Sequence, residues 1–384
     1  MRTISDTITR LAALRTAGAS SGFPASTSRL ARLSDFGSNP GGLNGYLYVP
    51  QTLGKNAALV VILHGCTQNA GGYDIGAGWS EMADRHGFAL LFPEQQRQNN
   101  PNLCFNWFSR DDNRRDAGEA LSIRQMVAAT IAQHGLDPAR VFVTGLSAGG
   151  AMASTMLAAY PDVFAGGAII AGLPYGCANT VPQAFDRMRG HDMPRASELT
   201  ELVRGASGHA GPWPTISIWH GTADATVSHS NAQAIVDQWR PLHGARAAPD
   251  HFETVGGHAR RAWTDATGRE VIEEYTITGM GHGTPLDTLS GDGCGVSGAY
   301  MLEVNISSTQ RICNFWGLLQ GADAIGARIP SEPEPARREK AVVADTIGAA
   351  VPPTFRQPLS GDSHRAGGVS KIIEDALRSA GLMR

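Results

Sequence analysis

A short segment near the middle of the chain, Thr-Gly-Leu-Ser-Ala-Gly-Gly-Ala-Met at 144–152, places one serine among small residues. The apolar run before it, 140–145, is typical of a buried strand, and the alanine-rich run after it is typical of a helix. Ser147 therefore falls at a strand-to-helix turn, between Gly145 and Gly149 in the pattern G-x-S-x-G. Such a tight turn leaves no room for side chains on either side of the serine, which explains the two glycines. The pattern predicts a hydroxyl exposed at the carboxyl edge of a sheet.

Further apolar segments alternate with helical patterns along the chain. The run at 58–65 is continuously apolar, as expected of a strand that is covered on both faces. Alternating strands and helices indicate a mostly parallel, doubly wound sheet, so the predicted fold class is α/β. In addition to 140–145 and 58–65, we expect strands at 88–93, 166–172, 215–221 and 271–277, and helices at 79–86 and 119–134.

This alternation of strand and helix patterns is confined to the central part of the 384-residue chain. Two stretches interrupt it, a mixed polar one at 176–211 and a Gly- and Ser-rich one at 283–312, and we expect them to form cap or site-wall insertions. The prolines and charges from 327 onward are typical of a linker. The predicted organisation is an N-terminal extension over 1–42, the α/β domain over 43–326, and a linker with a C-terminal helix at 370–380 over 327–384.

Composition narrows the class of protein. A net charge of −3 gives no indication of nucleic-acid binding. No apolar stretch reaches the roughly 18 residues of a membrane span, so no membrane partner is expected. The N-terminus has no continuous apolar core of the signal-peptide type. The sequence as given predicts a cytoplasmic protein, or a secreted or periplasmic one if a leader has been removed, and it says nothing of the oligomeric state.

The five cysteines have no C-x-x-C spacing, so no metal site is expected. Cys66 and Cys104 flank what reads as one strand–helix–strand crossover, and Cys294 and Cys313 flank a short segment. Either pair is a candidate disulfide. Buried reduced thiols are the alternative, and they suit a cytoplasmic chain equally well.

A serine hydroxyl is a weak nucleophile near neutral pH and needs a base. In enzymes built on this kind of turn, an acid and then a histidine follow the serine along the chain. Asp224 fits the acid because it comes just after the predicted strand 215–221, although an Asx turn capping the next helix would also explain it. Asp265 is the second candidate, but it lies in a turn-like segment between strands.

His282 is the predicted base, since it lies in a glycine-flanked loop directly after the strand at 271–277. His229 and His258 lack this context, and His220 precedes the acid.

The segment Leu-His-Gly-Cys at 63–66 follows an early strand. Such a loop supplies one backbone N–H to the oxyanion, and the residue after the nucleophile supplies the second. The predicted donors are the N–H groups of Cys66 and Ala148, each worth about 3 kcal/mol of transition-state stabilisation. His64 is assigned to the substrate-binding region, where we expect it to brace the loop rather than act as a base.

Three aromatic residues follow in the segment Asn-Pro-Asn-Leu-Cys-Phe-Asn-Trp-Phe at 100–108. Phe105 and Phe108 are expected in the core. Trp107 is expected to reach the cleft and contact a hydrophobic acyl group, because tryptophan suits a boundary that is apolar on one side and wet on the other.

These motifs, together with the segments 104–108, 118–127 and 172–178, resemble the polyhydroxybutyrate depolymerase family of esterases, relatives of bacterial feruloyl and acetylxylan esterases. The resemblance runs from about 43 to 320. It implies an α/β-hydrolase fold and a serine esterase that needs no metal or organic cofactor. Carried onto this chain, it implies Ser147, Asp224 and His282 as a catalytic triad, with Cys66 and Ala148 at the oxyanion hole.

The resemblance implies an ester substrate, either a polymer or an oligomer of 3-hydroxyalkanoates. A feruloyl or acetyl ester on plant polysaccharide is the alternative, and a non-catalytic α/β-hydrolase that only binds is a third. No adsorption module for solid polymer is evident, which favours soluble oligomers or small esters.

Overall fold

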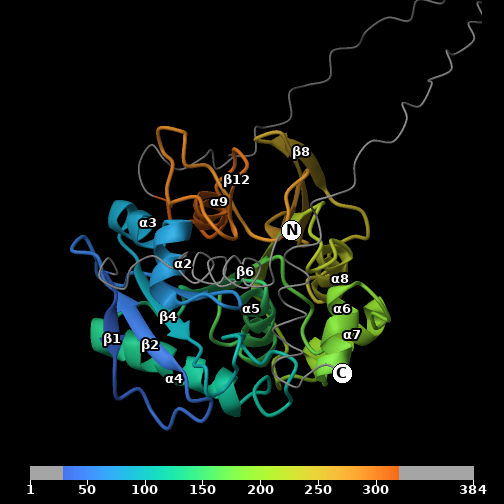
Figure 1. The fold of residues 1–384 in the computed structure, drawn as a ribbon. Coiled ribbons are helices and arrows are strands. Elements are labelled where there is room, and N and C mark those ends of the chain that lie inside the picture. The colour runs from blue at the N-terminus through green and yellow to red at the C-terminus, as the bar shows by residue number, and fades with distance from the viewer. Residues whose placement is uncertain (1–28, 320–384) are drawn as a thin grey trace, which may run out of the picture.

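A computed structural model describes residues 29–319 (Figure 1). The predicted linker, the predicted helix at 370–380 and most of the segment 1–42 lie outside the described residues. The core is one ten-stranded sheet in the order β1-β2-β4-β3-β5-β6-β7-β10-β9-β8. Its strands are β1 (Ala31–Leu33), β2 (Asn44–Tyr48), β3 (Leu59–Leu63), β4 (Ala89–Glu94), β5 (Val141–Leu146), β6 (Gly166–Ile170), β7 (Thr215–Gly221), β8 (His251–Val255), β9 (His258–Thr264) and β10 (Glu270–Ile277).

The six central strands of this sheet, from β4 across to β10, run parallel, and the strands at both edges pair antiparallel. This confirms the predicted mostly parallel α/β sheet. The sheet begins earlier than expected, because β1 lies within the segment that we took for an extension.

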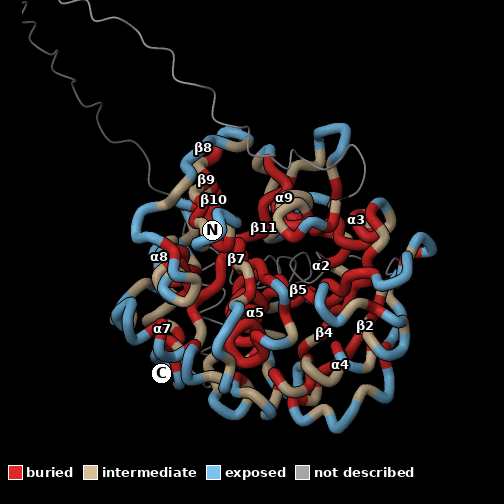
Figure 2. Tube along the Cα trace, turned by 180° about the vertical axis from the view of Figure 1, so that it is seen from behind, coloured by how far each residue is buried: buried red, intermediate tan, exposed pale blue. Residues whose placement is uncertain are grey.

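Helices cover both faces of the sheet. They are α2 (Ala70–Ala77), α3 (Trp79–His86), α4 (Gly118–His134), α5 (Ala148–Ala159), α6 (Val181–Met188), α7 (Ala196–Arg204), α8 (Ser230–Trp239) and α9 (Ser308–Phe315). Successive residues of β3 enter two separate apolar clusters: Leu59, Val61 and Leu63 pack with α4, α5 and α8, whereas Val60 and Ile62 pack with α2, α3 and α9. A strand covered on both faces must be apolar throughout, which is why 58–65 lacks polar alternation. Figure 2 shows the central strands buried between these layers.

The two predicted insertions have regular structure. Residues 176–211 contain α6 and α7, and residues 283–312 contain the first part of α9 and a small parallel pair, β11 (Thr284–Leu286) and β12 (Met301–Glu303). The hairpin of β8 and β9 was not predicted. Its first strand is exposed over most of its length and its second has two consecutive arginines, Arg260 and Arg261, at its centre, so neither has an apolar run.

In the part of the chain that the structure describes, no helix is both long and apolar enough to cross a bilayer. Nor do three or more His, Cys, Asp or Glu side chains gather there as ligands for a metal ion.

Candidate active site

Ser147 lies between the end of β5 and the start of α5, with φ 57° and ψ −117°. A non-glycine residue in this region is strained, and such strain collects at functional sites. A Cβ on Gly149 would lie 2.2 Å from the Leu63 carbonyl oxygen, and one on Gly145 would lie 2.4 Å from Gly149 carbon. The close approach of α5 to the ends of β3 and β5 therefore requires both glycines, as the G-x-S-x-G pattern predicts.

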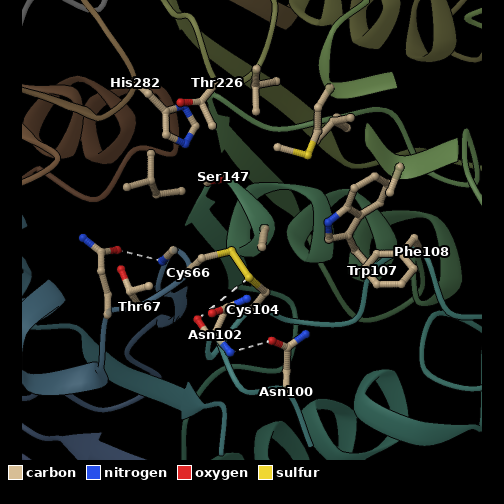
Figure 3. A pocket seen from close by; sticks show the side chains of 18 of the residues that line it. Cys66, Thr67, Asn100, Asn102, Cys104, Trp107, Phe108, Ser147, Thr226 and His282 are labelled. Atoms are coloured by element: carbon tan, nitrogen blue, oxygen red, sulfur yellow. Dashed lines mark hydrogen bonds between the residues drawn. A yellow bond between two sulfur atoms is a disulfide. The ribbon is translucent and has the colours of Figure 1, made fainter. Parts of the chain in front are cut away.

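The ends of four parallel strands bring the predicted residues to one edge of the sheet. Cys66 follows β3, Ser147 follows β5, Asp224 follows β7 and His282 follows β10. In open α/β sheets, ligands bind outside the carboxyl ends of the strands. Ser147 and His282 line the same pocket at this edge (Figure 3), and Asp224 lies behind the histidine, with its side chain buried.

The acid and the imidazole are in direct contact. His282 Nδ1 lies 2.7 Å from Asp224 Oδ2. Asp224 Oδ1 accepts from the backbone N–H groups of Thr226 at 2.8 Å and Val227 at 2.9 Å. The carboxylate is therefore fixed in place against Nδ1 of His282. The Nε2 atom on the opposite side of the imidazole ring stays available for the serine. In the described residues, no hydrogen bond joins this ring to the Ser147 hydroxyl, a contact that is often loose in unliganded enzymes.

Asp224 contacts a second histidine that sequence reasoning set aside. His220 Nε2 lies 3.4 Å from Asp224 Oδ2 and 2.9 Å from the Val227 carbonyl oxygen. Burial acts to raise the pKa of Asp224, but hydrogen bonds from His220 and His282 outweigh it and hold this pKa well below its usual range. The acid thus stays ionised beside His282. The sequence contained a signal for this contact, because in the segment His-Gly-Thr-Ala-Asp at 220–224 the histidine precedes the acid by four positions.

The alternative acid is excluded by its position. Asp265 lies in the turn between β9 and β10, where its carboxylate accepts from the backbone N–H groups of Thr267 and Arg269. It is a turn residue, as its sequence context suggested, and it takes no part in the pocket.

The predicted oxyanion donors also line the pocket, and neither the Cys66 N–H nor the Ala148 N–H has an acceptor among residues 29–319. His64 is buried behind this loop, outside the pocket, so its assignment to substrate binding was wrong. Its Nε2 accepts from Gln95 N–H at 3.1 Å, which leaves Nδ1 as the donor to the Gly65 carbonyl oxygen at 2.7 Å. Burial lowers the pKa of His64, which keeps the ring neutral in this bracing role.

Cys66 and Cys104 form a disulfide, which confirms one of the two predicted pairs. Cys294 and Cys313 are free, so that prediction was wrong. Both are buried, and the Cys294 sulfur lies 3.6 Å from Ser307 Oγ rather than in a bond to Cys313. A short separation along the chain does not by itself bring two thiols into bonding geometry. The fold of α9 and of the loop before it leaves Cys294 and Cys313 unbonded.

Reduction of the Cys66–Cys104 bond should lower the free energy of unfolding by about 2–4 kcal/mol, because it closes a loop with a sequence separation of 38. Thermal unfolding with and without reductant measures the effect. Without reductant, the unfolded protein should be alkylated at Cys177, Cys294 and Cys313 only. A C177S variant, which keeps the bond, is the matched control and should show the same response to reductant. Alkylation of all five cysteines before reduction would contradict the pairing.

The pocket encloses about 180 Å³ and has an apolar side and a polar side. Trp107 lines it, as predicted, and Phe108 does too, which corrects its assignment to the core. Phe105 is fully buried, as expected. One face of α6 also lines the pocket, with Val181, Ala184, Phe185 and Met188, so a segment of the predicted cap walls the site. Further apolar lining comes from Leu146, Leu173, Val227 and Tyr300, and polar side chains are contributed by Thr67, Gln68, Asn100, Asn102 and Thr226.

The chain is similar in sequence to several known enzymes. A sequence profile described as "Esterase PHB depolymerase" matches residues 43–262. Poly(3-hydroxyalkanoate) depolymerase C of Paucimonas lemoignei is 48% identical over 76% of this chain and 70% of that protein. Feruloyl esterase B of Talaromyces stipitatus is 32% identical over 67% of this chain and 73% of that protein.

The fold has a solved counterpart in an acetyl xylan esterase from Aspergillus awamori. It matches with a TM-score of 0.64 and 25% identity, over 76% of this chain and 99% of that one. Both the profile and the 48%-identical relative span most of the α/β domain. The chain therefore belongs to the esterase PHB depolymerase family of α/β-hydrolase enzymes.

Proposed function

We propose that the protein is a serine carboxylic-ester hydrolase in which Ser147, His282 and Asp224 act as the catalytic triad. The observation that carries this proposal is the Asp224–His282 contact beside the strained Ser147, in one pocket at the sheet edge.

Hydrolysis would proceed through an acyl-enzyme. Ser147 Oγ attacks the ester carbonyl carbon while His282 Nε2 takes the hydroxyl proton, and Asp224 stabilises the imidazolium that forms. The negative oxygen of the tetrahedral intermediate accepts from the N–H groups of Cys66 and Ala148. The bond from the carbonyl carbon to the alcohol oxygen then breaks, and His282 gives its proton to that alcohol. Water, deprotonated by His282, attacks the acyl-enzyme and releases the acid and the free serine.

We propose esters of 3-hydroxyalkanoate oligomers or polymer as the substrate class. The 48%-identical relative is a poly(3-hydroxyalkanoate) depolymerase, and the apolar side of the pocket suits an aliphatic acyl chain. A feruloyl or acetylxylan ester is the second candidate, supported by the relatives of those names and by an aromatic wall that would stack on a feruloyl ring. A panel of polyhydroxybutyrate film, hydroxybutyrate oligomers, methyl ferulate and acetylated xylan separates them, and highest kcat/KM on the oligomers is expected.

The Cys66–Cys104 disulfide beside the pocket is informative about the cellular compartment in which the protein works. Structural disulfides persist mainly in oxidising environments. Of the two alternatives that the sequence left open, we therefore propose the secreted or periplasmic one.

Trp107→Ala should raise KM for bulky esters, such as p-nitrophenyl octanoate, at least about tenfold more than for p-nitrophenyl acetate. Losing the burial of an acyl group against an aromatic side chain costs roughly 1.5–3 kcal/mol, and only a long acyl group reaches the Trp107 side chain. Initial rates on the two esters measure the ratio. Trp213, which packs on Trp239 outside the pocket, provides the control variant Trp213→Ala, with an unchanged ratio. Equal effects of Trp107→Ala on both esters would contradict the assignment of this wall to the acyl group.

A further inference from the structure

Glu119 is a buried carboxyl that the proposed mechanism does not use. It lies at the start of α4, fully buried, and forms no salt bridge in the described part of the chain. Oε1 accepts from Gln95 Nε2 at 2.6 Å and from Asn106 Nδ2 at 2.8 Å, and Oε2 accepts from Asn106 N–H at 2.9 Å. All three partners are donors, so both oxygens of Glu119 act as acceptors.

One chain of hydrogen bonds runs from Glu119 to the residue before Cys66. Gln95, held by its side chain on Glu119, donates its backbone N–H to His64 Nε2 at 3.1 Å. His64 Nδ1 in turn donates to the Gly65 carbonyl oxygen at 2.7 Å. Because the Gln95 N–H can only donate and the Gly65 carbonyl oxygen can only accept, the His64 ring accepts at Nε2 and donates at Nδ1.

A second chain runs from Glu119 to the residue after Cys66. Asn106 Oδ1 accepts from Asn100 Nδ2 at 3.0 Å, and Asn100 Oδ1 accepts from Asn102 N–H at 3.0 Å. The Asn102 carbonyl oxygen then accepts from Thr67 N–H at 2.7 Å. The close-up in Figure 3 shows Thr67, Asn100 and Asn102 of this chain below Cys66, near the disulfide.

The segment between the two ends needs such support. Thr67 has φ 63°, a strained conformation for a β-branched residue. Strained backbone persists only where its surroundings hold it. Cys66 stands between Gly65 and Thr67, so the direction of its N–H depends on both flanking peptides. The Gln95 side chain also donates to the Cys104 carbonyl oxygen at 3.1 Å, which ties the disulfide partner to the same carboxyl.

We propose that Glu119 is a positioning residue for ester hydrolysis, which holds the loop 65–67 from both sides so that the Cys66 N–H points at the oxyanion. This inference rests on the proposed function. Burial, together with the charge of Asp112, raises the pKa of Glu119 to about 8.

Glu119→Gln tests the role, because the amide has the same shape but meets one of the three donors with an N–H. The expected result is a fall in kcat on p-nitrophenyl butyrate of about 10- to 100-fold, below the 10²–10³ of a fully removed oxyanion donor, with KM within about threefold. Affinity for a boronic acid that mimics the tetrahedral intermediate should fall by a similar factor.

Ser122→Ala is the matched control. Ser122 lies one turn further along α4, and its hydroxyl makes buried hydrogen bonds with Gly41 N–H and the Gly118 carbonyl oxygen, outside the two chains. It should lower the melting temperature and leave kcat unchanged. If Glu119→Gln does not fold, Asn106→Ala decides, since it breaks the second chain and should lower kcat at unchanged KM.

A folded Glu119→Gln with lower melting temperature and unaltered kcat would overturn the inference and leave Glu119 a structural residue. If Glu119→Gln does not fold, an Asn106→Ala variant with unaltered kcat would overturn the inference instead. The proposed function is judged separately, by whether the wild type hydrolyses the ester and Ser147→Ala does not.

Discussion

Replacing Ser147 with alanine should lower kcat on a simple p-nitrophenyl ester by at least about 10⁴-fold, because no other group in the proposed mechanism can form the acyl-enzyme. Alanine fits the turn, since the Ser147 side chain makes no capping hydrogen bond to α5. Circular dichroism and the melting temperature should therefore match the wild type. Steady-state kinetics on the purified variant, freed of wild-type contamination, measures the loss.

The same prediction extends to the partners of the serine. Asp224→Asn should cost roughly 10⁴-fold in kcat, as expected when the imidazole loses its orienting carboxylate. His282→Ala should cost at least as much. Near-normal activity of Asp224→Asn would show that the Asp224–His282 contact is structural only, and it would remove the basis of the proposed triad.

Gly149→Ala should strongly destabilise the fold. Its Cβ would lie 2.2 Å from the Leu63 carbonyl oxygen and 2.5 Å from that of His64. Both are backbone atoms at the end of β3, so they cannot move aside as a flexible side chain would. We expect a loss of at least about 4 kcal/mol in the free energy of unfolding, at the upper end of point mutations, or failure to fold.

Urea unfolding, followed by tryptophan fluorescence, measures this effect. Gly54→Ala is the control, because a Cβ there meets no atom within 4 Å, and it should change stability by no more than about 0.5 kcal/mol. A Gly149→Ala variant as stable as Gly54→Ala would show that α5 does not approach β3 as closely as described.

Local sequence signals predicted the parts of the site that depend on backbone geometry. The turn around Ser147 was evident because only glycine permits the approach of α5 to β3, and the continuous apolar run of β3 identified a strand buried on both faces. Asp224 and His282 were identified because each directly follows a predicted strand and because acid and histidine follow the serine in that order along the chain. Each of these follows from a constraint that acts within a few residues.

Features that depend on packing between distant segments were missed or misjudged. The contact of His220 with Asp224 needs the particular turn after β7, and the position of Phe108 in the pocket depends on where α6 lies. The free state of Cys294 and Cys313 depends on how α9 docks. The hairpin of β8 and β9 is exposed, so burial leaves no apolar pattern along it. Tertiary contacts decide all four, and apart from the four-residue spacing of His220 and Asp224 no local motif records them.

The most direct test of the central claim is covalent labelling with a serine-directed organophosphonate, followed by mass spectrometry of the digested protein. We expect one adduct, on the peptide that contains Ser147, formed by the wild type and the Gly54→Ala variant. Labelling should be absent from Ser147→Ala and strongly slowed in His282→Ala, which lacks the base. An adduct on another serine, or equal labelling of Ser147→Ala, would contradict the assignment of Ser147 as the nucleophile.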